Sequence, residues 1–333
     1  MPNIAKTAWF RLVAFALGMA LAVGLIRRLG TDPGPLRIGI NVWPGYEYLY
    51  LAKVKGFFEE EHARVEIVEF GALLDSRRAF ERGQIDGLAT TAVEVVLSRS
   101  LTASSLQAVQ ILDWSDGGDV ILSDSGHRDL ASLRGAKIGV ESGTVGVYLL
   151  SRALSTRGMG LKDVQLVSSN PYSLSSMLET GELNAVVTYP PFSVRSLRCP
   201  GIHEVYSSAK IPGEIVDLVA VGASVLRARP KDVEAMLRAY WRARAYASAF
   251  PREADSIMAS REGISPGELE ASFRSGVRMV DAGEQQGFMA RGGRLESVMV
   301  RTDSLLRSLG EISGPSRIGH VVDGRFGATG VRP

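Results

Sequence analysis

Two parts of the sequence repeat one pattern about a hundred residues apart, and this repeat limits the folds that the chain can adopt. The stretch RIGI at 37–40 returns as KIGV at 137–140, and RGQIDGLATT at 82–91 returns as TGELNAVVTY at 180–189. The first pair is offset by 100 residues and the second by 98. Such similar offsets favour a duplicated unit over a chance match between common β-α-β phrases. The sequence therefore predicts two similar lobes, each with a small doubly wound sheet.

Strand and helix signals alternate along the rest of the chain, as in parallel α/β proteins. Strands are expected at 36–40, 65–70, 85–90, 106–112 and 120–123, and helices at 48–55, 75–82, 93–99 and 145–156. Helix starts are expected at Asn170 and Ser265, which are capping residues each followed by proline. After 215–221 the chain reads as mainly helical, with a long helix at 230–249. We expect this last part to return and cover the first lobe.

The first thirty residues hold the whole basic surplus of the chain. The net charge is +2, but residues 1–30 carry four basic residues and no acid, so the remainder has a net charge of −2. A run of fifteen uncharged residues, LVAFALGMALAVGLI, spans 12–26 behind Lys6 and Arg11. This pattern predicts an export segment at 1–35, either a cleaved signal or a retained membrane anchor. The expected location is the periplasm, with membrane attachment through this segment in the second case.

Composition excludes several classes of protein. Cys199 is the only cysteine, which excludes a disulfide framework, a cysteine-based zinc site and a lipoprotein anchor. The four histidines are scattered, and the nearly balanced charge argues against a nucleic-acid partner. No Walker loop, dinucleotide fingerprint or GxSxG motif is present. We therefore expect no catalytic residue, no metal site and no cofactor.

Five loops follow predicted strands, at the carboxyl edge where open α/β sheets bind ligands. The candidate ligand-binding residues in these loops are Asn41, Trp43, Pro44, Tyr46, Thr90, Thr91, Asp113, Ser115, Asp116, Ser142, Gly143, Thr144 and Tyr189. Loop aromatics beside proline and glycine favour a pocket wall over lid packing. The Ser142-Gly143-Thr144 turn fits an anion or carbonyl site at a helix start and an ordinary helix cap equally well.

These loops resemble those of a known family, the substrate-binding proteins of ABC importers of the nitrate/taurine type, including those for thiamine-precursor pyrimidines. The resemblance covers about 36–310 and rests on the motifs at 41–46, 49–58, 83–87, 113–119, 133–139, 184–192 and 215–217. The last motif adds Asp217 to the candidate ligand-binding residues. Pro190 stands where the family often has an acidic residue, and the family's lipid-anchoring cysteine is absent.

The resemblance implies the type II periplasmic-binding-protein fold. Each of its two lobes would be a small mixed, mainly parallel sheet flanked by helices, and two crossover strands would join them. The first lobe would comprise 36–119 and 219–333, and the second 120–218. The lobes would close by a hinge around a small solute, and a membrane permease would recognise the closed form.

The candidate loops carry Asp113, Asp116, Asp119 and Glu141 but no Lys or Arg. We therefore expect a neutral or nitrogen-bearing, ring-containing solute stacked on Trp43, Tyr46 or Tyr189. Two alternatives stay open. One is an enzyme of the same fold, resembling pyrimidine synthases or menaquinone-pathway enzymes. The other is a membrane-tethered sensor that reports its ligand to a partner.

Overall fold

The computed structural model describes residues 34–327 of the chain. The predicted export segment falls almost entirely outside these residues. The described residues from Leu36 to Gly327 belong to one compact unit. Among residues 34–327, no helix combines the length and the apolar character that crossing a membrane requires.

The first lobe contains a six-stranded sheet in the order β11-β4-β10-β3-β1-β2. Its strands are β1 (Leu36–Ile40), β2 (Val65–Glu69), β3 (Gly87–Thr91), β4 (Leu106–Ser115), β10 (Val216–Gly222) and β11 (Val277–Met279). Only β2, β1 and β3 pair in parallel, and β10, β4 and β11 pair antiparallel. All residues of β3 and β10 are buried, as expected for central strands covered on both faces.

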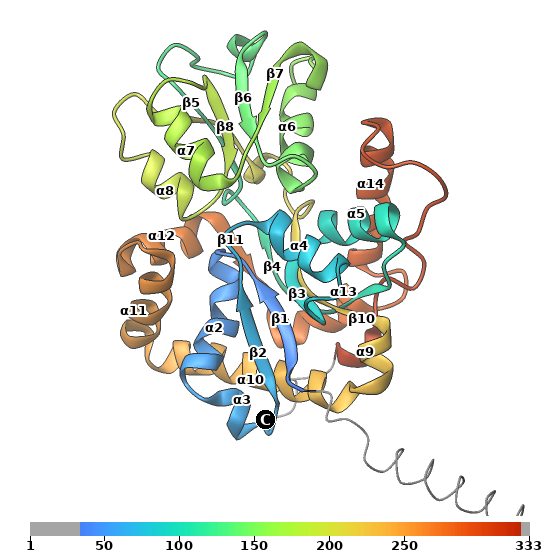
Figure 1. The fold of residues 1–333 in the computed structure, drawn as a ribbon. Coiled ribbons are helices and arrows are strands. Elements are labelled where there is room, and N and C mark those ends of the chain that lie inside the picture. The colour runs from blue at the N-terminus through green and yellow to red at the C-terminus, as the bar shows by residue number, and fades with distance from the viewer. Residues whose placement is uncertain (1–33, 328–333) are drawn as a thin grey trace, which may run out of the picture. The chain divides into compact units, whose positions relative to one another are not determined.

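The second lobe contains a five-stranded sheet in the order β7-β6-β8-β5-β9. Its strands are β5 (Val120–Ser123), β6 (Lys137–Val140), β7 (Gln165–Ser168), β8 (Ala185–Thr188) and β9 (His203–Ser207). This order matches β2-β1-β3-β10-β4 of the first lobe strand for strand, with the fourth strand antiparallel in both. The two-lobed fold is thereby confirmed, and the internal repeat is visible in its topology (Figure 1).

Both sheets are mixed, as the sequence predicts. Parallel pairing is confined to three strands in each sheet, and the remaining pairs are antiparallel. The chain passes from the first sheet to the second between β4 and β5, and returns between β9 and β10. The strand β10 begins at Val216, close to the residue at which the chain was expected to return to the first lobe. The lobe boundaries after residues 119 and 218 stay a prediction.

Helices cover both faces of each sheet (Figure 1). One face of the first sheet packs against α2 (Glu47–Val54), α3 (Phe57–Glu60), α9 (Ala223–Ala228), α10 (Pro230–Ala249), α11 (Pro251–Glu262) and α12 (Pro266–Gly276). The other packs against α4 (Leu73–Glu81), α5 (Ala92–Thr102), α13 (Gln285–Met289) and α14 (Arg294–Ser308). The second sheet lies between α6 (Val145–Ser155) and the pair α7 (Pro171–Glu179) and α8 (Phe192–Ser196).

The expected helix starts and the helical return of the chain are confirmed. The Asn170 side chain accepts a hydrogen bond from the Ser173 N–H, and Ser265 and Glu268 form a capping box. After β10 the regular elements of the described chain are helices, except for the short strand β11. Its long helix spans Pro230–Ala249, as predicted, and buries Val233, Met236 and Tyr240 against the first lobe.

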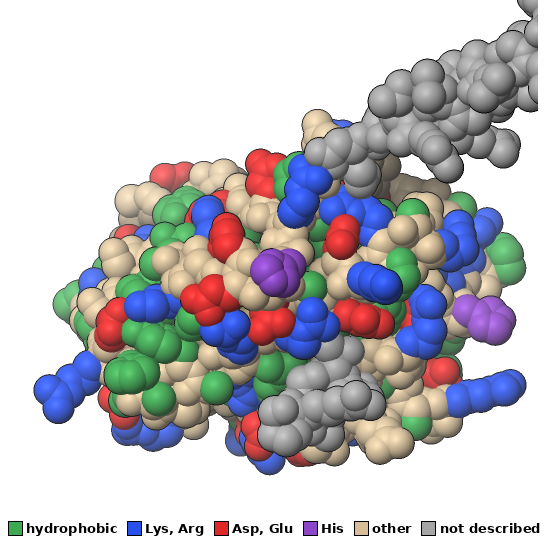
Figure 2. Space-filling model, turned by 90° about the horizontal axis from the view of Figure 1, so that it is seen from below, with side chains coloured by type: hydrophobic (Ala, Val, Ile, Leu, Met, Phe, Trp, Pro, Cys, Tyr) green, Lys and Arg blue, Asp and Glu red, His purple; other side chains and the backbone are tan. Residues whose placement is uncertain are grey.

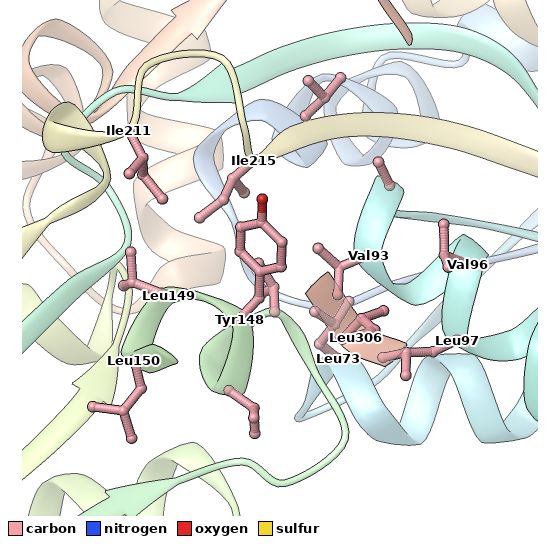
Figure 3. Close-up of a cluster of buried hydrophobic side chains, with 14 of the residues drawn as sticks. Leu73, Val93, Val96, Leu97, Tyr148, Leu149, Leu150, Ile211, Ile215 and Leu306 are labelled. Carbon is pink, nitrogen blue, oxygen red and sulfur yellow. The ribbon is translucent and has the colours of Figure 1, made fainter. Parts of the chain in front are cut away.

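One hydrophobic cluster continues from the first lobe into the second (Figure 3). Val93 and Val96 come from α5, whereas Tyr148 and Leu149 come from α6, and all four are at most 2% exposed. The Tyr148 ring lies between Val93 and Ile215 in this view. Burial of apolar surface therefore stabilises the arrangement of the two lobes in the structure.

Charges of both signs are interspersed on the face of the first lobe that points away from the second (Figure 2). Arg238 and Arg242 of α10 pair with Glu61 and Glu60 at the end of α3. Such exposed pairs contribute little to stability. Their arrangement leaves this face without a broad patch of one sign.

Candidate functional site

The loop after β1 is a tight aromatic turn held by buried carboxylates. Pro44–Tyr46 form one turn of 3₁₀ helix, preceded by Trp43 in an extended conformation. Trp43 Nε1 donates to Asp113 Oδ1 at 3.1 Å, and the Tyr46 hydroxyl donates to Asp217 Oδ1 at 2.6 Å. A Cβ atom on Gly45 would overlap Asp113 Oδ2, so only glycine fits at this position.

Asp113 and Asp217 are neighbours because β4 and β10 are paired. The two residues are direct partners in the antiparallel register, and both are fully or almost fully buried. Loss of water raises the pKa of Asp113 to about 7, and it raises the pKa of Asp217 well above its usual range. Repulsion from Asp113 and Asp119 raises the pKa of Asp217 further. Asp113 and Asp217 therefore form a buried pair of carboxyls, next to the aromatic turn, that favours protons or other positive charge.

A small cavity of about 20 Å³ lies against this turn, between the two lobes. Its lining residues are Asn41, Trp43, Tyr46, Leu73, Thr91, Asp119, Val145, Tyr189 and Asp217. A second cavity of about 10 Å³ adjoins it and shares Leu73, Asp119, Val145 and Tyr189. Each space holds at most about one water molecule.

Three aromatic rings form one wall of the larger cavity. The Trp43 ring centroid lies 6.5 Å from that of Tyr46 and 6.2 Å from that of Tyr189. Tyr189 comes from the second lobe, directly after β8, so the aromatic wall joins the two lobes. Burial raises the pKa of the Tyr46 and Tyr189 hydroxyls well above the usual value, and nearby carboxylates add to this effect.

Asp119 and Glu141 extend the acidic lining toward the second lobe. Burial raises the pKa of each carboxyl to about 7. The backbone N–H of Asp119 donates to Ser115 Oγ, and Ser115 Oγ is also 2.7 Å from Ser208 Oγ. The two cavities have no Lys or Arg side chain in their lining. Among residues 34–327, no cluster of His, Cys, Asp and Glu has the arrangement of a metal site.

The structure brings six of the predicted residues to the larger cavity: Asn41, Trp43, Tyr46, Thr91, Tyr189 and Asp217. Thr144 lines the neighbouring cavity, while Pro44, Thr90, Asp113 and Ser115 are buried but line neither. Asp116 and Ser142 are exposed, Gly143 is half-buried, and none of the three lines a cavity. The Thr144 hydroxyl oxygen accepts a hydrogen bond from the Gly146 N–H and so caps α6. This is the ordinary helix cap that the sequence allowed for the Ser142-Gly143-Thr144 turn.

Sequence reasoning missed several residues of this region. Leu73 and Val145 line both cavities, but as apolar residues at helix starts they look like ordinary core positions. Asp119 was noted among the acidic residues of the candidate loops, but nothing in the sequence indicated that it would line the cavity. Arg77 lies on α4, outside the loops, and its Nη2 donates to the Gly143 carbonyl of the opposite lobe at 3.1 Å.

A protein-family model matches residues 43–254, which include the aromatic turn and both crossovers between the lobes. The chain belongs to the NMT1/THI5-like family. This NMT1/THI5-like protein is 23% identical over 311 residues to a putative binding protein of Brucella abortus, covering 90% of this chain and 93% of that protein. It is 29% identical over 258 residues to a putative thiamine biosynthesis protein of Haemophilus influenzae, covering 73% of this chain and 77% of that protein.

The fold of the NMT1/THI5-like chain is also similar to that of a solved binding protein. The alkanesulfonate-binding protein of Xanthomonas axonopodis pv. citri, solved with bound MOPS, superimposes with a TM-score of 0.74. The match covers 88% of this chain and 99% of that protein at 18% sequence identity. At this identity the likeness establishes the fold, and the ligand is argued from the residues of the site.

Proposed function

We propose that this protein is an extracytoplasmic solute-binding protein of an ABC importer, and that it holds a small, ring-containing, nitrogen-bearing or neutral solute between its lobes. The observation that carries the proposal is the cavity walled by Trp43, Tyr46 and Tyr189 and by the carboxyls of Asp119 and Asp217. Aromatic faces bind flat rings, and buried carboxylates bind N–H donors or cationic nitrogen.

The electrostatics of the site favour this class of solute over a bare oxyanion. Asp113, Asp119, Asp217 and Glu141 are all buried, and each has a raised pKa because burial disfavours its charge. An anion placed among them would be repelled by each of these carboxyls that is ionised, in a medium of low dielectric constant. An amine, an amidine-like ring or a protonated aminopyrimidine would instead stabilise their ionised forms.

Hinge closure is the proposed mechanism of capture. A ring of six atoms needs more space than the cavities of about 20 and 10 Å³, so entry of a solute requires the lobes to part. Polar contacts that join the lobes would re-form on closure. Arg195 Nη2 donates to the Glu262 carbonyl at 2.5 Å, and Arg198 pairs with Glu268. Both pairs link the region of α8 to the helices of the first lobe.

The names of the relatives fit this proposal. The Brucella relative is called a binding protein, and the Haemophilus relative is named for thiamine biosynthesis, which suggests a pyrimidine as one solute to test. Delivery to a membrane permease, with the N-terminal segment as a signal or an anchor, completes the proposed role. The matching solved protein supports the architecture that such a role needs.

Calorimetric titration with 4-aminopyrimidines, aliphatic amines, ethanesulfonate and nitrate tests the proposed function. We expect one aminopyrimidine or cyclic amine to bind with one site per chain, and we expect no heat from nitrate. A Trp43→Ala, Tyr189→Ala double variant should lose this binding, whereas Phe250→Ala, which removes a largely exposed ring, should keep it. Tight binding of an oxyanion alone would contradict the proposal. Chemical turnover of the bound solute would favour the enzyme alternative.

A further inference from the structure

Two buried glutamates reach across the gap between the lobes to helix starts on the opposite side. Glu94, on α5 of the first lobe, accepts a hydrogen bond from the Val145 N–H of α6 at 2.7 Å. Glu141, at the end of β6 in the second lobe, accepts one from the Leu74 N–H of α4 at 3.0 Å. The exposed fraction is 0% for Glu94 and 7% for Glu141. The two contacts are reciprocal, because each lobe gives one carboxylate and receives one.

Hydrogen bonds from the helix starts favour the ionised form of each carboxylate, whereas burial acts against it and raises the pKa of both side chains. The first N–H groups of a helix lack partners within the helix, and the helix dipole places partial positive charge at its start. The capping position of α4 is Ala72, which has no side-chain oxygen, so Glu141 supplies what the helix itself lacks. At α6, Thr144 satisfies the Gly146 N–H, and the remaining Val145 N–H is satisfied by Glu94.

We propose that Glu94 and Glu141 act as built-in anions, which cap the helices of the opposite lobe when the lobes close and restrict the cleft to solutes without negative charge. This inference rests on the proposed solute-binding function and concerns its specificity. The start of a helix is where a protein most readily binds an external anion. In this chain the α6 start borders the smaller cavity through Thr144, Val145 and Gly146, and Glu94 already fills the anion position there.

The groups around the two carboxylates strengthen the exclusion of anionic solutes from the cleft. Thr91 donates its hydroxyl to the second oxygen of Glu94, so both oxygens of that residue are engaged. Arg77 is the nearby cation. Its Nη1 donates to Glu81 at 3.0 Å and its Nη2 to the Gly143 carbonyl at 3.1 Å, while its buried Nε has no hydrogen-bond partner. An entering anion would therefore have to displace a carboxylate or lie beside one, with no uncommitted positive side chain in either cavity lining.

Chemical rescue tests the inference directly. In Glu94→Ala the helix start of α6 loses its carboxylate, and added formate or nitrate should take its place. We expect such an anion, at about ten times its dissociation constant and at constant ionic strength, to raise the Tm of Glu94→Ala by roughly 2–4 °C. Glu141→Ala offers the same test at α4, and it serves if Glu94→Ala does not fold. The wild-type protein should show no such shift.

Glu262→Ala is the matched control. Glu262 is also a buried carboxylate, 1% exposed, but it lies on α11 and lines neither cavity, so its removal should create no site for formate. An equal Tm shift in wild type or in Glu262→Ala overturns the inference. So does the absence of a Tm shift in Glu94→Ala and Glu141→Ala, provided that they fold. Wild-type binding of aminopyrimidines is measured separately, so failure of the proposed function and failure of this inference give different results.

Discussion

The loops after β1 and β6 occupy equivalent places in the two lobes, yet their chemistry differs. The loop after β1 presents Trp43 and Tyr46, both buried and both hydrogen-bonded to carboxylates. The loop after β6, Glu141 to Thr144, is short and partly exposed, and its main contribution is the start of α6. A duplicated scaffold thus has one lobe that supplies two aromatic side chains to the cavity, and a second that supplies helix ends and one aromatic residue, Tyr189.

The largest expected effect comes from the aromatic wall. The Trp43→Ala, Tyr189→Ala double variant should weaken solute binding by about 100-fold or more, because stacking area is lost on both sides of the cleft. Titration calorimetry measures the loss, and Tyr172→Ala is a second control because its ring is 55% exposed on α7. Unchanged affinity in the double variant would contradict the role assigned to this wall.

A pair of glycine substitutions compares the two loops themselves. Gly45→Ala should abolish tight binding, since its Cβ would overlap Asp113 Oδ2 and displace the partner of Trp43. Gly143→Ala should cost only about 1 kcal/mol in the free energy of unfolding, from its backbone φ of +70°, because its Cβ lies 3.6 Å from Arg77 Nη2. Urea denaturation and calorimetry measure both. Equal losses of affinity would remove the distinction between the loops.

Asp217→Asn separates solute recognition from folding. We expect the affinity for a cationic solute to fall about 10-fold or more, because one acceptor loses its charge. The amide oxygen can still accept from the Tyr46 hydroxyl, and removal of a charge beside Asp113 and Asp119 relieves repulsion. The free energy of unfolding should therefore stay the same or rise. A fall in stability together with unchanged affinity would assign Asp217 a structural role only.

The smallest expected effect is the pH dependence of the free energy of unfolding and of the affinity for a cationic solute. Burial raises the pKa of Asp113, Asp119 and Glu141 to about 7 from usual values of 3.8 and 4.5. Between about pH 4 and 7 the folded state binds more protons than the unfolded state, so the free energy of unfolding falls as pH rises and then levels off. Affinity for a cationic solute should change in the opposite sense and decrease from pH 8 to pH 5. Affinity that is constant over this range would contradict the acidic site.

The sequence predicted those features that depend on local pattern. The repeat at 37–40 and 137–140 became β1 and β6 at equivalent places in two sheets of matching order. Capping signals at Asn170 and Ser265 marked true helix starts. Loop aromatics pointed to Trp43, Tyr46 and Tyr189, which meet at one cavity. Each of these signals lies within a few neighbouring residues.

The features that sequence reasoning missed depend on contacts between the lobes. Glu94 lies within a helix and looks like a solvated position, but packing of the lobes buries it against α6. Arg77 likewise donates to the Gly143 carbonyl only because α4 lies next to that turn of the second lobe. Ser142 and Asp116 were proposed from their loops, but both are exposed and line neither cavity. No single-sequence pattern reports such long-range contacts.

The central claim, that a ring-binding acidic cleft lies between the lobes, is tested most directly by titrating the purified protein, freed of any bound solute, with a 4-aminopyrimidine and with ethanesulfonate in parallel. The account predicts saturable binding of the aminopyrimidine with one site per chain, lost in Trp43→Ala, Tyr189→Ala, and no binding of the sulfonate. Saturable binding of ethanesulfonate with no response to the aminopyrimidine would contradict it.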